Sequence, residues 1–281
     1  MIRVTETFRD REILLVGANG FIGKVLLALL LERFPEIRRI YFLIRPKTGG
    51  SPEDRFARTV LASPPLQAVL SEIGLERVTE KVVVLAGDIS LPDCGLSEMD
   101  LLPLVDRISL IVNCAGLVEF TPPVDDSVNA NATGVENVVA LARRTGAALL
   151  HVSTCFVCGV SDGLVEETEP ILGFYPYRKG PGDHSFNHER ELAHCREQIR
   201  RIYDSDPASQ HGGHRSKEAA HRLTELGKQR AGLWGWVNTY TYSKSLGEQI
   251  IAAEPGLRYA IVRPAIVEAA VRFPFPGWVE G

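Results

Sequence analysis

The sequence has few cysteines, no long apolar run and no large excess of charge of one sign. Its five cysteines are odd in number and follow no framework spacing, so we expect reduced thiols in a cytoplasmic protein. No apolar run reaches the roughly 18 residues of a membrane-spanning helix, and the amino terminus lacks a signal-peptide pattern. A net charge of −4 and a pI near 6.0 give no general reason to expect a nucleic-acid partner.

What is present is an ordinary globular composition, 45% hydrophobic and 23% charged, over 281 residues. Short apolar runs alternate with helical patterns along most of the chain. Strands are predicted at 12–16, 39–44, 81–86, 108–113, 148–153 and 258–263. Strand–helix–strand units of this kind predict an α/β fold of the Rossmann type, a doubly wound parallel sheet.

A glycine turn follows the first strand directly and precedes an apolar helix over about residues 24–34. Gly17 would permit the tight turn, Gly20 the approach of backbone to a pyrophosphate, and Gly23 the close packing of helix on strand. The first turn of the helix would then present free N–H groups to the phosphates. This placement predicts a dinucleotide-binding loop.

The end of the second strand indicates which dinucleotide binds. An NAD site usually has an acidic residue there, whereas this chain has Arg45-Pro-Lys47. A guanidinium suits the 2′-phosphate of NADP, so we expect NADPH as the cofactor. The alternative is that Arg45 and Lys47 are solvated basic residues at a strand end.

Tyr240 and Lys244 are four residues apart in a segment predicted to be helical. This spacing puts the phenol and the ammonium on one face, and an ammonium nearby lowers the pKa of a phenol, which makes it a usable proton donor. Thr154 follows the fifth strand and would complete the site, with Ser153 as the alternative. Without a catalytic role, Thr154 would be a β-branched residue that favours a strand, and the other two would be helix surface.

Residues 162–236 read as an insertion before this helix. A Gly- and Pro-rich loop precedes charged, solvent-facing helices at about 186–203 and 215–232. Such insertions shape a substrate entrance or contact a partner. Its histidines show no recurrent ligand spacing, and Cys155 and Cys158 lie in what reads as a strand end, so we expect no metal and no redox pair.

Together the glycine turn, Thr154 and the Tyr240–Lys244 pair resemble the extended short-chain dehydrogenase/reductase superfamily. Further motifs resemble the alcohol-forming fatty acyl-CoA reductases of the bacterial type. They are Ile44-Arg-Pro-Lys, Gly87-Asp-Ile, His151-Val-Ser-Thr, Asn238-Thr-Tyr-Thr-Tyr-Ser-Lys-Ser and Val262-Arg-Pro-Ala-Ile-Val-Glu. The resemblance covers nearly the whole chain. That family usually continues further, so the chain would be an amino-terminal NADP-binding domain, 1–281, without the carboxyl-terminal part that closes over the acyl group.

The resemblance implies NADPH-dependent reduction of a long-chain acyl-CoA to an aldehyde and then to a primary alcohol. Thr154, Tyr240 and Lys244 would be catalytic, Asp88 and Ile89 would border the adenine, and residues 264–266 the nicotinamide. The residues expected to hold the cofactor are Gly17, Asn19, Gly20, Phe21, Ile22, Gly23, Arg45, Lys47, Asp88, Ile89, Ala115, Gly116, Leu117, Asn131, Tyr240, Lys244, Pro264 and Ile266.

Three other functions stay open on the residues alone. A carrier-protein thioester could replace acyl-CoA. A nucleotide-sugar epimerase or dehydratase would need polar contacts after the sixth strand, where Phe273, Phe275 and Trp278 are apolar. A non-catalytic NADP-binding module would not need Thr154, Tyr240 and Lys244. The sequence leaves the oligomeric state open, with a homodimer as one alternative.

Overall fold

The computed structural model describes residues 4–46, 50–167, 170–180, 182–212 and 215–280. The chain divides into two compact units. The first comprises Met1–Ala115, Asn137–Val152 and Leu257–Gly281, and the second comprises Gly116–Glu136 and Ser153–Gly256. Among the described residues no helix is both long enough and apolar enough to cross a membrane.

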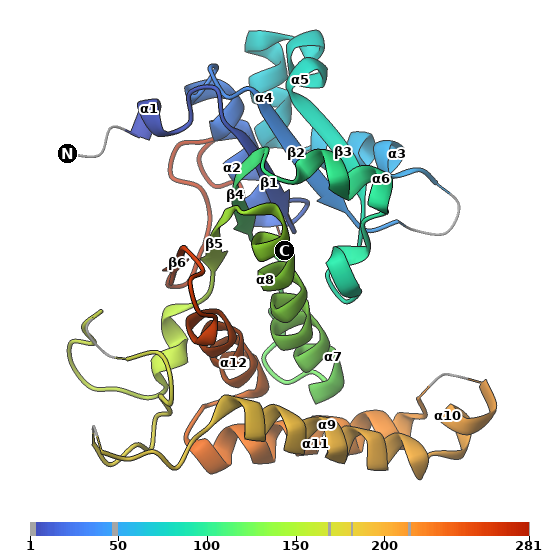
Figure 1. Ribbon diagram of the computed structural model, residues 1–281, viewed down its shortest axis with the longest axis vertical. Coiled ribbons are helices and arrows are strands. Elements are labelled where there is room, and N and C mark those ends of the chain that lie inside the picture. The colour runs from blue at the N-terminus through green and yellow to red at the C-terminus, as the bar shows by residue number, and fades with distance from the viewer. Residues whose placement is uncertain (1–3, 47–49, 168–169, 181, 213–214, 281) are drawn as a thin grey trace. The chain divides into compact units, whose positions relative to one another are not determined.

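The first unit contains one parallel sheet, in the strand order β3-β2-β1-β4-β5-β6 (Figure 1). Its strands are β1 (Glu12–Val16), β2 (Arg39–Ile44), β3 (Val82–Ala86), β4 (Ile108–Asn113), β5 (Ala148–Val152) and β6 (Tyr259–Val262). This order confirms the predicted doubly wound α/β fold. The predicted bounds are right for β1, β2 and β4. They differ by one residue at one end of β3 and β5, and by one residue at each end of β6.

Apolar side chains cover both faces of the central strands, as expected for a parallel sheet that carries helices. All five residues of β1 are buried, and Phe42 of β2 stacks edge-on against Phe56 with ring centroids 4.9 Å apart. Up to Ala115, the helical elements of the first unit are α1 (Val4–Thr7), α2 (Phe21–Arg33), α3 (Pro52–Phe56), η1 (Ala57–Leu61), α4 (Pro64–Ile73), α5 (Leu75–Lys81), η2 (Pro92–Gly95), α6 (Glu98–Leu101) and η3 (Leu102–Leu104). Pro64 occupies the first turn of α4, where its missing N–H removes no helical hydrogen bond.

The second unit is helical. Its elements are α7 (Val124–Val128), η4 (Asn129–Thr133), the first turn of α8 (Gly134–Thr145), η5 (Cys155–Cys158), α9 (His188–Asp204), α10 (Pro207–Gly212), α11 (Lys217–Trp234) and α12 (Thr239–Ala253). The helical stretch from 124 to 145 is interrupted by a π-helical turn, η4. α8 continues into the first unit from Asn137 on.

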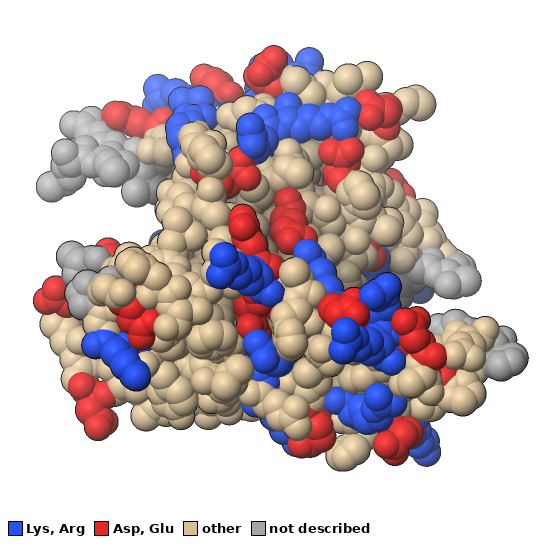
Figure 2. Space-filling model, turned by 60° about the horizontal axis from the view of Figure 1, so that its bottom comes forward, with Lys and Arg blue, Asp and Glu red and all other residues tan. Residues whose placement is uncertain are grey.

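The insertion helices α9 and α11 run side by side (Figure 1) and are less solvated than predicted. Each has an apolar face, with Leu192 and Cys195 on α9 and Leu223 on α11 buried in one hydrophobic cluster with Leu246 of α12. Their outer faces carry interspersed charges of both signs, as the lower part of Figure 2 shows, with pairs such as Glu197 with Arg201. The predicted helix at 186–203 is α9 at 188–204, the one at 215–232 is α11 at 217–234, and α10 was not predicted.

Cys155 and Cys158 do not lie in a strand end, which corrects the sequence-based assignment. β5 ends at Val152, and the two cysteines begin and end the 3₁₀ turn η5. The side chain of Thr154 accepts a hydrogen bond from the Phe156 N–H, at 3.3 Å, and this bond caps the turn. A capping residue of this kind favours the start of a helical turn over the continuation of a strand.

Candidate active site

The glycine loop of the first unit is closely packed at Gly17 and at Gly23. Gly17 has a φ of +72°, and a Cβ at this position would collide with the backbone of Ala115 at the end of the adjacent strand β4. Gly23 faces the backbone of Ala18 so closely that no side chain fits there. The loop is thus tight enough that residues larger than glycine would force it open.

The amino terminus of α2 is open to an anion. Gly20 is its capping residue, no side chain caps the helix, and its first turn contains no acidic residue. Unpaired N–H groups and the positive end of the helix dipole therefore remain available for a phosphate. Phe21 packs on Trp278 with ring centroids 5.0 Å apart, Asn19 is half-buried, and Ile22 is 37% exposed.

Arg45 lies just past β2 with its side chain 70% exposed, and its guanidinium is 3.5 Å from a carboxylate oxygen of Asp88. The other oxygen of Asp88 accepts hydrogen bonds from the N–H and hydroxyl of Ser90. The carbonyl of Ile89 accepts a hydrogen bond of 2.6 Å from the Asn137 amide. These contacts order the loop after β3 beside an accessible cation. Lys47 lies outside the described residues.

The remaining predicted cofactor residues of the first unit lie at strand ends. Ala115 follows β4, and Pro264 and Ile266 follow β6, with Ile266 72% exposed. Sheets of parallel strands bind ligands at the carboxyl ends of the strands. Their contact with a cofactor stays a prediction.

In the second unit, the structure brings Tyr240 together with Thr154. Both lie in this unit, Tyr240 in the first turn of α12 and Thr154 before η5, and their side chains form a hydrogen bond. Asn238 caps α12 by accepting a hydrogen bond of 2.9 Å from the Thr241 N–H. The Tyr240 N–H donates to the Phe120 carbonyl at 3.3 Å, which attaches the start of α12 to the preceding loop.

The amine of Lys244 lies beside Gly116. A Cβ on Gly116 would be 2.7 Å from the Lys244 Nζ and 2.8 Å from the Asn131 Oδ1. Asn131, in the π-turn η4, accepts a hydrogen bond of 2.9 Å from the Leu117 N–H and donates one of 3.0 Å to the Leu117 carbonyl. Four residues predicted to hold the cofactor, Gly116, Leu117, Asn131 and Lys244, thus lie close together. Among them Asn131 makes its hydrogen bonds with the Leu117 backbone.

Ser243 is a member of this cluster that the sequence reasoning did not select. It accepts a hydrogen bond of 2.9 Å from the Asn131 amide, and its hydroxyl lies 3.0 Å from the Tyr240 carbonyl, to which it donates. The sequence feature that could have identified Ser243 is its position directly before Lys244 and three residues after Tyr240. At this spacing its hydroxyl reaches back to the preceding turn of the helix.

Burial raises the pKa of the Tyr240 phenol above its ordinary value, while the hydrogen bond with Thr154 acts in the opposite direction. The nearby Cys155 thiol raises this pKa further. The net direction is opposite to the decrease predicted from the Tyr240–Lys244 spacing, because removing the phenolate from water costs more than the hydrogen bond returns. At neutral pH the phenol therefore keeps the proton that a general acid needs.

Among the described residues no group of three or more His, Cys, Asp or Glu side chains has the arrangement of a metal site. His188 on α9 is buried, and burial lowers the pKa of its imidazole. A buried neutral histidine of this kind is part of the packing of α9.

A model of the male sterility protein family matches residues 15–281, which is nearly the whole chain. The chain belongs to this family. Among curated members, it is 31% identical over 280 residues to probable fatty acyl-CoA reductase 4 of Arabidopsis thaliana. It is 28% identical over 285 residues to the alcohol-forming fatty acyl-CoA reductase of Simmondsia chinensis. These alignments confirm the resemblance to fatty acyl-CoA reductases.

The alignments cover 97% and 99% of this chain but only 55% and 56% of those two relatives. The chain therefore spans about half the length of the curated relatives it matches. Among solved structures, the terminal R domain of the myxalamid PKS-NRPS biosynthetic pathway is similar, with a TM-score of 0.59 and 25% identity. That likeness covers 93% of the present chain and 50% of the R domain.

Proposed function

We propose that the chain is the nucleotide-binding and catalytic part of an NADPH-dependent fatty acyl-CoA reductase, which converts a long-chain acyl-CoA to an aldehyde and then to a primary alcohol. The observation that carries this proposal is the hydrogen-bonded pair of Thr154 and Tyr240, with Lys244 one helical turn further along α12. In a family member related to fatty acyl-CoA reductases, this set of groups suits reduction of a carbonyl.

The first unit fits the phosphate-bearing part of a dinucleotide. The uncapped amino terminus of α2 offers N–H groups to a pyrophosphate, and Gly20 adds no side chain to the approach. Arg45 supports NADPH over NADH, because its exposed guanidinium can pair with a 2′-phosphate. Bound NADPH would supply the hydride.

The second unit fits the acid chemistry at the substrate carbonyl. As hydride adds to the thioester carbon, negative charge develops on the oxygen, and the Tyr240 and Thr154 hydroxyls would stabilise it by hydrogen bonds. Collapse of the adduct releases the CoA thiolate and leaves the aldehyde. When the aldehyde is reduced, Tyr240 would give its proton to the oxygen to form the alcohol. Lys244 would hold the nicotinamide ribose.

The deciding experiment follows NADPH oxidation by absorbance with palmitoyl-CoA and, separately, with a nucleotide sugar, beside a direct titration of NADPH binding. We expect turnover with palmitoyl-CoA alone, and consumption of two NADPH per thioester. Turnover with the nucleotide sugar would replace this proposal by an epimerase or dehydratase. NADPH binding without turnover on any substrate would favour a binding module.

Tyr240→Phe tests the role of the Tyr240 phenol in the same assays. We expect this variant to lose turnover by a factor of about 10² or more, because the phenol donates the proton, while its Kd for NADPH changes little. Full activity in this variant would remove Tyr240 from the mechanism.

A second candidate is reduction of an acyl thioester on a carrier protein. The similarity to the terminal R domain of a PKS-NRPS pathway, at a TM-score of 0.59, favours this candidate over the nucleotide-sugar enzymes. Palmitoyl-CoA and a palmitoyl thioester on a phosphopantetheinylated carrier protein should be compared at equal concentration. A higher kcat/KM on the carrier would decide for the second candidate.

A further inference from the structure

A buried carboxylate joins three helices of the second unit. Glu191, on α9, has a side chain that is 3% exposed. Its Oε1 accepts hydrogen bonds from the Tyr242 hydroxyl, at 2.6 Å, and from the Arg230 Nε, at 2.8 Å. Its Oε2 accepts from the Trp234 Nε1, at 3.0 Å, and from a second guanidinium nitrogen of Arg230. Four donors fill the roughly four lone-pair positions of a carboxylate.

The charge of this carboxylate is balanced where it lies. Arg230, on α11, forms a forked ion pair with Glu191 and is itself only 16% exposed. Bidentate pairs of this kind fix the orientation of both side chains. Glu191 therefore has a defined position from which it can hold a further group.

That further group is Tyr242, on the helix that bears Tyr240. Tyr242 is fully buried and packs against Trp236, with ring centroids 5.6 Å apart. Residues two apart on a helix differ in direction by about 200°. Tyr242 therefore points inward, away from the face that carries Tyr240 and Lys244, and its hydrogen bond acts on the same turn of α12.

We propose that Glu191 is a positioning residue, which holds α12 through the Tyr242 hydroxyl and so keeps Tyr240 in its hydrogen bond with Thr154. The inference rests on the role proposed for Tyr240. It also gives the insertion a function that the sequence did not suggest: α9 and α11 support the catalytic helix from inside the unit.

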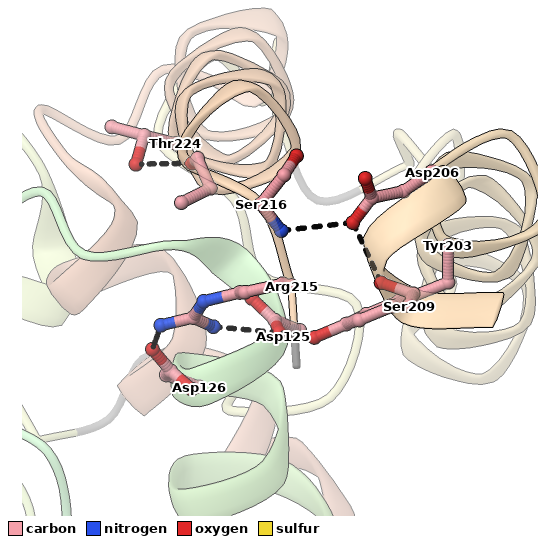
Figure 3. Close-up of polar contacts among 9 residues, drawn as sticks. Asp125, Asp126, Tyr203, Asp206, Ser209, Arg215, Ser216 and Thr224 are labelled. Atoms are coloured by element: carbon pink, nitrogen blue, oxygen red, sulfur yellow. Dashed lines mark hydrogen bonds and ion pairs between the residues drawn. The ribbon is translucent and has the colours of Figure 1, made fainter. Parts of the chain in front are cut away.

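Tyr242→Phe tests this inference because it removes one hydroxyl and leaves the aromatic ring in the core. Tyr203→Phe is the matched control. The Tyr203 hydroxyl also donates at 2.6 Å to a carboxylate, Asp125, which is paired with Arg215 (Figure 3). This second network joins α9 to α7, and among the described residues it includes none of α12. A general loss of stability would affect both variants alike.

The first measurement is NMR of protein labelled with ¹³C at the tyrosine ring carbon that bears the hydroxyl. The chain has seven tyrosines, so the spectrum is simple, and Tyr240→Phe assigns the signal of interest. We expect the Tyr240 signal to move in Tyr242→Phe and to stay in place in Tyr203→Phe. An unmoved signal in Tyr242→Phe, or an equal movement in both, would overturn the proposal.

The second measurement is steady-state kinetics on the acyl thioester. We expect Tyr242→Phe to lower kcat by a factor of about 10 with little change in KM, because the loss concerns transition-state stabilisation. An unchanged kcat would contradict the positioning role. If the wild-type chain itself lacks turnover, the proposed function fails, and the NMR comparison still decides the inference on Glu191.

Should Tyr242→Phe fail to fold, Trp234→Phe takes its place, since it removes another donor to the same carboxylate from α11. We expect the ¹³C signal of Tyr240 to shift in Trp234→Phe as well. A signal that does not shift in this variant would also overturn the proposal.

Discussion

Thr154 and Ser153 are adjacent buried hydroxyl residues, yet their surroundings differ. The Thr154 side chain is hydrogen-bonded to Tyr240 and to the Phe156 N–H, whereas the Ser153 hydroxyl has no hydrogen-bond partner among the described residues. These surroundings support assigning the proposed catalytic role to Thr154 and not to Ser153, the alternative that the sequence left open.

Replacing each of these two residues separates their roles. We expect Thr154→Val to lower kcat by about 10²-fold, as expected for removal of one donor to a developing oxyanion. Ser153→Ala should stay within a factor of about three, since it breaks no hydrogen bond of the described structure. Steady-state kinetics of both variants checks this, and the reverse ranking would make Ser153 the catalytic residue.

Arg45 and Arg38 flank β2 at opposite ends, and both are exposed arginines paired with a carboxylate, Asp88 and Glu12 respectively. Only Arg45 lies at the carboxyl end of the strand, where a dinucleotide binds. We expect Arg45→Ala to weaken NADPH binding by about tenfold and NADH binding much less, because the proposed bidentate contact with the 2′-phosphate would be lost. Arg38→Ala serves as the control in the same fluorescence titrations. Equal losses for NADPH and NADH in Arg45→Ala would refute the proposed selectivity.

At the scale of the elements, the start of α12 depends on a single capping side chain. Asn238 accepts a hydrogen bond from the Thr241 N–H, and Ser216 caps α11 in the same way through the Ala219 N–H at 3.0 Å. Removal of such a cap costs about 1 kcal/mol of stability.

Asn238→Ala and Ser216→Ala should therefore lower the free energy of unfolding by similar amounts in urea titrations. We expect only Asn238→Ala to lower kcat as well, because Tyr240 lies in the first turn of α12. If both variants lose kcat in proportion to their stability, the cap has no specific effect on the site.

Local pattern was sufficient to predict the strands, because each is a short apolar run that ends at small or polar residues. It was also sufficient for the glycine loop, whose spacing the backbone requires at Gly17 and Gly23. The short helices α5 and α10 were missed because neither has a repeating apolar face long enough to recognise.

Two features of the site depended on tertiary structure and could not be predicted. The pKa of Tyr240 is decided by burial, which the Tyr240–Lys244 spacing does not report. The contact of Asn131 with Leu117 and Ser243 joins segments 14 and 112 residues away in the chain. No periodicity within one helix carries that information.

At the scale of the whole molecule, each unit buries a thiol that cannot ionise easily. Burial raises the pKa of Cys94, in the first unit, and of Cys195, in the second, to about 12. The pKa of a thiol in an unfolded chain is about 8.5. Above that pH the unfolded chain releases protons that the folded chain retains, so the stability contributed by both groups is full below about pH 8.5 and is lost as the pH rises toward 12.

We expect the free energy of unfolding to fall by roughly 1.4 kcal/mol per pH unit for each of these thiols above about pH 9. Urea titrations at pH 7.5, 9 and about 10.5 would measure this slope. Cys94→Ala and Cys195→Ala should each make the slope shallower, even though the cavity lowers stability at every pH. A slope that is unchanged in both variants would show that other groups govern the alkaline limit.

The π-turn η4 sets a limit on how this protein can change by insertion and deletion. Such a turn is an α-helix with one residue added, and each residue of an α-helix advances the direction of the side chains by about 100°. Deleting one residue within Asn129–Thr133 would restore a regular helix, which is locally favourable. It would also turn α7 by about 100° relative to the first turn of α8 and take Asp125 and Asp126 away from Arg215. In the evolution of this protein, substitutions in this helix should therefore be tolerated more readily than the deletion of a single residue.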